Sequence, residues 1–193
     1  MLSTTVSDGT AMLPTPRLFD RDGVYSPDLR NFRKWRGALD RFARELADPA
    51  NAEAEIWRNL VAALPTADAG PVLLEAVNAA VNGRRYVTDA VNWGQGDYWA
   101  SPLEFLRRSG DCEDFAVAKY LALRERGVAA DDMRVVVLDD LDLGVTHAIL
   151  AVRRDAEFYI LDNQRPAILP AAAIAHYQPI YAVNEQGWWD YEE

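Results

Sequence analysis

The chain has 193 residues, of which 50% are apolar and 26% are charged, so it can bury a hydrophobic core and is not an intrinsically disordered protein. Its net charge of −10 excludes a sequence-independent nucleic-acid binder and disfavours docking on anionic lipid, because both need a basic face. No run of 18 apolar residues marks a membrane span, and a single cysteine excludes an internal disulfide.

Helical patterns fill the first half of the chain, after a lead-in over residues 1–26 that is rich in Ser, Thr, Gly and Pro and is expected to be irregular. Pro27 predicts the start of the first helix, because proline is favoured in a first helical turn. Apolar residues at spacings of three and four continue to Leu46 and form one face of an amphipathic helix. Similar patterns predict helices over residues 51–64 and 71–83.

The second half of the chain changes from helices to strands. Residues 84–100 have no sustained period and are expected to form an extended loop, and 101–108 predict a short helix with a capping start. A longer helix is expected from Cys112 to Gly127. Three strands are expected after it, over residues 134–138, 147–153 and 157–162. Helices followed by a small antiparallel sheet predict one α+β domain over residues 27–193.

The only cysteine, Cys112, is expected at the N-terminus of this longer helix, after a turn at Gly110. Unpaired backbone N–H groups and the helix dipole favour an anion there, and the same N–H groups could hold an oxyanion. Asp111, Glu113 and Asp114 oppose a thiolate, because nearby negative charge raises the pKa of a thiol. From these residues alone, Cys112 is an inert buried side chain, a metal ligand or a nucleophile.

One of the two histidines, His147, opens a predicted strand, and Asp162 closes the next one. With a turn at residues 154–157, Ile149 lies opposite Asp162, so His147 and Asp162 are diagonal neighbours on one face. A shift of register by one residue would separate them. Alternatively, the histidine is a structural residue at a strand end and the aspartate belongs to a turn. His176 has no acidic residue near it in the sequence and is expected to be structural.

A thiol at a helix N-terminus and a histidine oriented by a carboxylate are the parts of a Cys-His-Asp hydrolase. Further residues carry a family resemblance: Trp93, Asp97-Tyr98-Trp99, Pro102, Glu104, "GDCEDFAVAKYLALRERGV", His147 and "ILDNQ". Over residues 75–189 the chain resembles the bacterial transglutaminase-like cysteine proteinases.

The resemblance implies a papain- or transglutaminase-like fold, with helices first and the catalytic cysteine at the start of a central helix packed on a small antiparallel sheet. It assigns the catalytic roles to Cys112, His147 and Asp162. The implied activity is that of a cysteine endopeptidase. A transglutaminase-like acyl transfer to an amine is an alternative, because both reactions use the same thioester. A binding module that acts mainly through a regulatory receptor is another alternative.

The best-known members of the family are calcium-dependent periplasmic proteases that cut the N-terminal region of large surface adhesins and so release cells from biofilms. An inner-membrane receptor that senses cyclic di-GMP sequesters them. The resemblance therefore implies an adhesin substrate, this receptor as a partner, and calcium. It assigns calcium to Asp111 and Glu113, and more weakly to Asp97. A calcium ion would cancel the negative field around Cys112.

Location and three minor features complete the predictions. The resemblance implies a periplasmic location. No leader peptide is visible in the sequence, so the cytoplasm is the alternative. Asp139, Asp140 and Asp142 are expected in a solvated turn, with a second cation site as the minority interpretation. They do not match an EF-hand loop. Trp188 and Trp189 either cover an edge of the core or anchor a partner.

Overall fold

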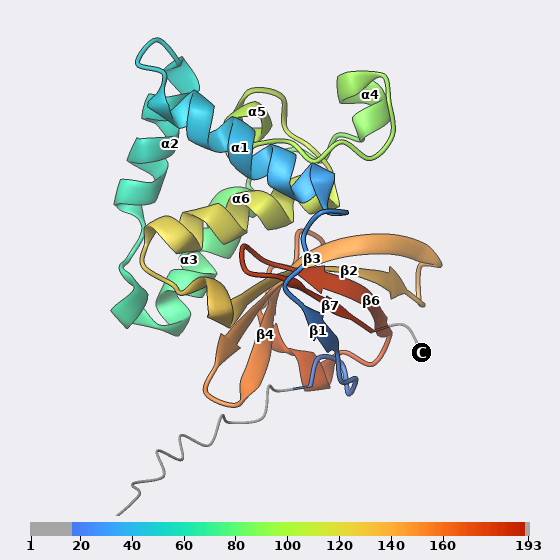
Figure 1. The fold of residues 1–193 in the computed structure, drawn as a ribbon. Helices are drawn as coiled ribbons and strands as arrows, with labels where there is room; N and C mark the ends of the chain where they lie inside the picture. Colours follow the sequence, from blue (N-terminus) through green and yellow to red (C-terminus); the bar gives the residue numbers. More distant parts are fainter. Residues whose placement is uncertain (1–16, 192–193) are drawn as a thin grey trace, which may run out of the picture.

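Helices and strands separate into two layers in the computed structural model, which describes residues 17–191 (Figure 1). The helices are α1 (Arg33–Ala47), α2 (Ala52–Ala63), α3 (Pro71–Asn82), α4 (Asp89–Trp93), α5 (Pro102–Arg108) and α6 (Cys112–Glu125), with 3-10 helices η1 (Ala67–Ala69), η2 (Ala130–Asp132) and η3 (Ala171–Ala173). The strands are β1 (Val24–Ser26), β2 (Met133–Asp140), β3 (Val145–Arg154), β4 (Glu157–Leu161), β5 (Leu169–Pro170), β6 (Tyr177–Val183) and β7 (Trp188–Asp190). Among the described residues, no helix is both long and apolar enough to cross a membrane.

The strands form one antiparallel sheet in the order β1-β7-β6-β2-β3-β4-β5. The hairpin of β3 and β4 has the predicted register, with Leu150 opposite Leu161. Because β4 ends there, the stretch of β3 from Val145 to Ile149 has no partner strand on that edge within residues 17–191, while β2 continues to pair with its other edge. This open edge is where the site described below forms.

Helix α6 is the centre of the fold. Every side chain from Glu113 to Leu123 is buried, because the helix packs on β3 and β2 on one side and against α3 and α5 on the other. An apolar core fills the space between the helices and the sheet, and a second, smaller core lies on the opposite face of the sheet. The expected α+β fold, with a central helix that starts at Cys112 and packs on an antiparallel sheet, is confirmed.

The boundaries differ from the predictions at the N-terminus. Residues 1–16 of the expected irregular lead-in lie outside the described residues, but its end forms β1, which pairs with β7. The first helix begins at Arg33 and not at Pro27, because Ser26 is held opposite Trp188 and Asp28 accepts hydrogen bonds from the backbone and side chain of Arg30. A strand of three residues is too short for its alternation to be recognised in the sequence.

Two further differences concern short elements. Residues 84–100 were predicted to be a loop, but they contain α4, a single turn that ends at Gly94 in the left-handed conformation. Strands β5, β6 and β7 extend the sheet beyond the three expected strands. Pro170 and Pro179 lie inside two of these strands and mask them in the sequence, since proline normally argues against a strand.

Candidate active site

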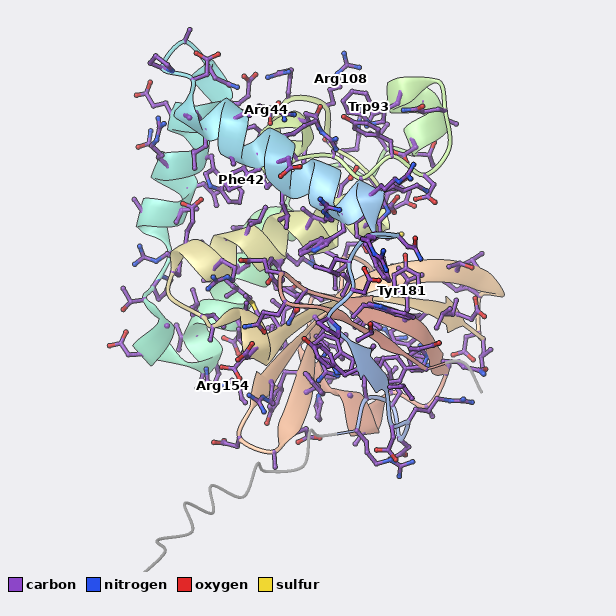
Figure 2. All side chains as sticks on the ribbon, in the orientation of Figure 1. Phe42, Arg44, Trp93, Arg108, Arg154 and Tyr181 are labelled. Atoms are coloured by element: carbon purple, nitrogen blue, oxygen red, sulfur yellow. The ribbon has the colours of Figure 1, made fainter. Side chains whose placement is uncertain are left out.

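A pocket of about 360 Å³ lies between the N-terminus of α6 and the open edge of β3. Cys112 from α6 lines it together with His147 and Ala148 from β3. Trp99 and Tyr181 form part of its wall. Figure 2 shows Tyr181 at the boundary between the helices and the sheet. The pocket therefore brings the single thiol and one of the two histidines to the same cavity.

The local sequence places Cys112 at the first position of α6. The Asp114 carboxylate accepts a hydrogen bond from the backbone N–H of Asp111 at 3.3 Å, which is one half of a capping box. A Cβ atom at Gly110 would collide with the Asp114 carboxylate, so only glycine allows this approach. The carbonyl of Gly110 also accepts a hydrogen bond from the N–H of Val87 at 2.8 Å. These contacts hold the turn that presents Cys112.

The surroundings of Cys112 oppose its ionisation. Burial is the largest cause that raises the pKa of the thiol, and the negative charge of Glu113 adds to it. The thiol lies 3.3 Å from Oε2 of Glu113, whose own pKa is raised to about 8 by burial and by Asp111. A hydrogen bond from the backbone N–H of Ala148, on the open edge of β3, acts in the opposite direction. Burial and the neighbouring acids therefore disfavour a thiolate at Cys112.

His147 and Asp162 form a buried pair, as the predicted register requires. Nε2 of His147 lies 2.9 Å from Oδ1 of Asp162, and the two side chains are 3% and 1% exposed. Burial by itself would raise the pKa of Asp162, but hydrogen bonds from His147, Tyr177 and the backbone N–H of Gln164 hold it below its ordinary value. Because Nε2 faces the carboxylate, Nδ1 is the ring nitrogen left for exchange with the pocket.

Three aspartates meet beside the N-terminus of α6. Asp89, Asp111 and Asp114 each offer a carboxylate oxygen, and these oxygens lie within 4.8 Å of one another. Burial is the main cause that raises the pKa of Asp89, and it raises that of Asp114 to about 9 together with the neighbouring acids. Oδ1 of Asp89 and Oδ1 of Asp111 are buried without a hydrogen-bond partner among the described residues. This donor set fits a hard divalent cation.

Of the three expected metal ligands, only Asp111 belongs to this cluster. Glu113 lies against the Cys112 sulfur, and Asp97 pairs with Lys34 and accepts a hydrogen bond from Nε1 of Trp99 at 3.0 Å. Asp89 was missed because it lies 22 residues before Asp111, in a stretch predicted to be a loop. The sequence does contain a signal for α4, because Asp89 follows Thr88, and threonine is favoured at the position before a helix.

The minor predictions have mixed outcomes. His176 has no acidic residue near it in the sequence, but the fold brings one to it: its Nδ1 lies 3.5 Å from Asp142, and its Nε2 lies 2.8 Å from Arg165. Asp140 is buried and not solvated, since its carboxylate accepts two backbone N–H groups of the β2–β3 turn. The indole of Trp189 stacks under Arg134 at 3.7 Å, so it covers the sheet.

Comparison with known proteins identifies the family. A family model described as bacterial transglutaminase-like cysteine proteinase matches residues 50–190. The chain belongs to this family. Comparison with curated protein sequences gives no match.

Solved structures support the assignment. Calcium-bound LapG of Legionella pneumophila is 32% identical, with a TM-score of 0.63 over 81% of this chain and 87% of that one. The EGTA-treated form of the same protein is 30% identical, with a TM-score of 0.63 over 87% of this chain and 89% of that one. As a member of the family, the chain is a cysteine peptidase, and its substrate is a protein.

Proposed function

We propose that this proteinase is a calcium-dependent endopeptidase with Cys112, His147 and Asp162 as its catalytic triad, and that it cleaves the N-terminal region of a large cell-surface adhesin to control biofilm attachment. The observation that carries the triad is a pocket shared by the thiol and a histidine that is bound to a buried aspartate. Cys112 and His147 line the same pocket, and His147 is joined to Asp162 at 2.9 Å.

In the proposed reaction Cys112 is the nucleophile, and His147 acts as a base and then as an acid. Nδ1 of His147 takes the proton of the Cys112 thiol, and the thiolate attacks the scissile carbonyl carbon. Backbone N–H groups at the N-terminus of α6 stabilise the oxyanion. His147 then gives the proton to the leaving amine, which departs and leaves a thioester. Water, deprotonated by His147, attacks the thioester and releases a free carboxylate and the thiol.

Asp162 stays ionised through these steps. It accepts Nε2–H of His147, which selects the tautomer with a free Nδ1 and stabilises the imidazolium. Its lowered pKa is consistent with this role, because the carboxylate remains charged at neutral pH in spite of its burial.

Calcium is proposed to bind at Asp89, Asp111 and Asp114. The support is the crowding of three acids, two of whose buried oxygens have no hydrogen-bond partner in the described part of the chain, together with the calcium-bound and EGTA-treated structures of the similar LapG. The ion would supply positive charge that offsets the acids around Cys112. Asp111 is common to this donor set and to the set first expected. Glu113, whose carboxylate interacts with that of Asp111, remains a proposed ligand, and Asp97 remains the weaker candidate.

The family resemblance supports the remaining parts of the proposal. They are a periplasmic location, an adhesin as the substrate, and an inner-membrane receptor for cyclic di-GMP as the partner that sequesters the enzyme.

The test uses purified protein and a recombinant N-terminal segment of a large adhesin from the same bacterium, with calcium present. Wild-type protein should give two fragments with a new free carboxylate at the cut, as determined by mass spectrometry. Cys112→Ala should give none while its circular dichroism spectrum is unchanged. Cleavage that persists in Cys112→Ala would refute the nucleophile. Incorporation of an added amine at the cut would instead indicate acyl transfer.

A further inference from the structure

The carboxylate of Asp162 is held through both of its oxygens. Oδ1 receives Nε2–H of His147 and the backbone N–H of Gln164, each at 2.9 Å. Oδ2 receives the hydroxyl of Tyr177 at 2.6 Å, and this bond is buried. Hydrogen bonds to a charged acceptor are shorter and stronger than neutral ones, so the Tyr177 contact is a strong one.

Tyr177 itself has little freedom to move. It is 4% exposed, and its ring makes edge contacts with Phe19 at 5.6 Å and His176 at 4.6 Å between centroids. The guanidinium of Arg165 lies over the same ring at 6.0 Å. Burial and the bond to Asp162 raise the pKa of Tyr177, so the hydroxyl keeps its proton and remains a donor.

A carboxylate turns easily about its last torsion angle, which has broad minima. His147 and Gln164 both bind Oδ1, so they leave Oδ2 without an anchor of its own. The Tyr177 hydroxyl provides that anchor. Tyr177 lies on β6, a strand that contributes no residue to the proposed triad.

We propose that Tyr177 is a positioning residue of the active site, which fixes the Asp162 carboxylate so that His147 presents Nδ1 to Cys112. This inference rests on the proposed triad. Tyr177 would join the three residues of the triad as a fourth residue of the site, which touches neither the substrate nor the thiol and acts through Asp162.

The experiment measures how fast iodoacetamide alkylates the thiol, with calcium present, from about pH 5 to about pH 9. Cys112 is the only cysteine, so the mass of the intact protein reports this site alone. Tyr177→Phe should slow the reaction about tenfold near neutral pH and change its pH profile, because it removes one hydrogen bond to a charged group. Tyr120→Phe is the matched control, since its buried hydroxyl donates to a different carboxylate, Glu185, at 3.1 Å.

The same substitution in an Asp162→Ala background distinguishes a positioning role of Tyr177 from a packing role. In Asp162→Ala the Tyr177 hydroxyl has no carboxylate to hold, so adding Tyr177→Phe should change the rate less than about twofold. An unchanged rate in Tyr177→Phe alone would overturn the inference. So would an equal loss in both backgrounds, or an equal loss in Tyr120→Phe.

The same assay recognises failure of the proposed triad. A wild-type thiol that reacts no faster than the thiol of His147→Asn would refute the triad itself, and the inference with it. A fast wild-type reaction that Tyr177→Phe leaves unchanged would refute only the role of Tyr177.

Discussion

Nε2 of His147 lies 2.9 Å from Oδ1 of Asp162 at the point where β4 ends and the edge of β3 becomes free. The pairing of Leu150 with Leu161 brings the two residues together across one hairpin. The same open edge lets the N-terminus of α6 approach β3, so that the pocket joins His147 to Cys112. The end of one short strand thus accounts for the contact between His147 and Asp162 and leaves free the edge of β3 that lines the pocket together with Cys112.

Asp162→Ala should lower kcat about 100-fold or more, with a much smaller change in KM, because Asp162 orients the general base and does not touch the substrate. The measurement is the steady-state cleavage of the adhesin segment. Asp131→Ala, which removes an exposed acid from η2, is the control and should keep the wild-type rate. Equal kcat values for wild type and Asp162→Ala would contradict the role of the aspartate.

Removal of calcium with a chelator should abolish cleavage and lower the melting temperature, because three crowded carboxylates lose their counter-charge. Added calcium should restore both. Asp89→Asn should need about tenfold more free calcium, or more, for half-maximal activity, since it removes one charged ligand. Asp131→Asn serves as the control in the same buffered calcium titration. Full activity in excess chelator would exclude the proposed calcium dependence.

Gly110→Ala should destabilise the protein by about 2 kcal/mol, because the added methyl group has no room beside the Asp114 carboxylate. It should also weaken calcium binding, since Asp114 must move. Gly96→Ala is the matched control, because a Cβ atom there meets open space. Urea denaturation of both variants gives the comparison. If both variants match the wild-type stability, the close packing at Gly110 is not what holds this turn.

Lys119 makes stability depend on pH. It is fully buried in α6, and burial lowers its pKa to about 7, although Asp162 partly counteracts this effect. The unfolded chain has an ordinary lysine pKa of about 10.4, so between about pH 7 and pH 10 it binds a proton that the folded protein does not. In this window Lys119 makes the free energy of unfolding rise with pH, by up to roughly 1.4 kcal/mol per unit. Below about pH 7 Lys119 is protonated in the folded protein as well, and the free-energy cost of burying its charge no longer changes with pH.

Lys119→Met should remove this dependence. The difference in unfolding free energy between variant and wild type should be largest near pH 7 and shrink towards pH 10, as measured by urea denaturation at several pH values. Lys34→Met is the control, because the Lys34 side chain is about half exposed. Parallel stability curves for Lys119→Met and wild type would show that Lys119 does not titrate in this range.

Local patterns predicted much of this protein. The spacing of apolar residues identified α2 and α3 to within a few residues. Strong helix formers after the turn at Gly110 identified α6, with Cys112 at its start. The turn between β3 and β4 was enough to derive the register that joins His147 to Asp162. These predictions held because helical periodicity, capping and hairpin register depend on residues close together in the chain.

The sequence by itself therefore predicted α2, α3, α6 and the β3–β4 hairpin, and it pointed to Cys112, His147 and Asp162 as the residues of the proposed triad. Only the tertiary structure decided which distant groups join them. Asp89 meets Asp111 and Asp114 through the folding of α4, and Tyr177 reaches Asp162 from β6. β1 pairs with β7 at the other end of the chain. Such contacts arise from the packing of whole elements around a core, and no local spacing in the sequence records them.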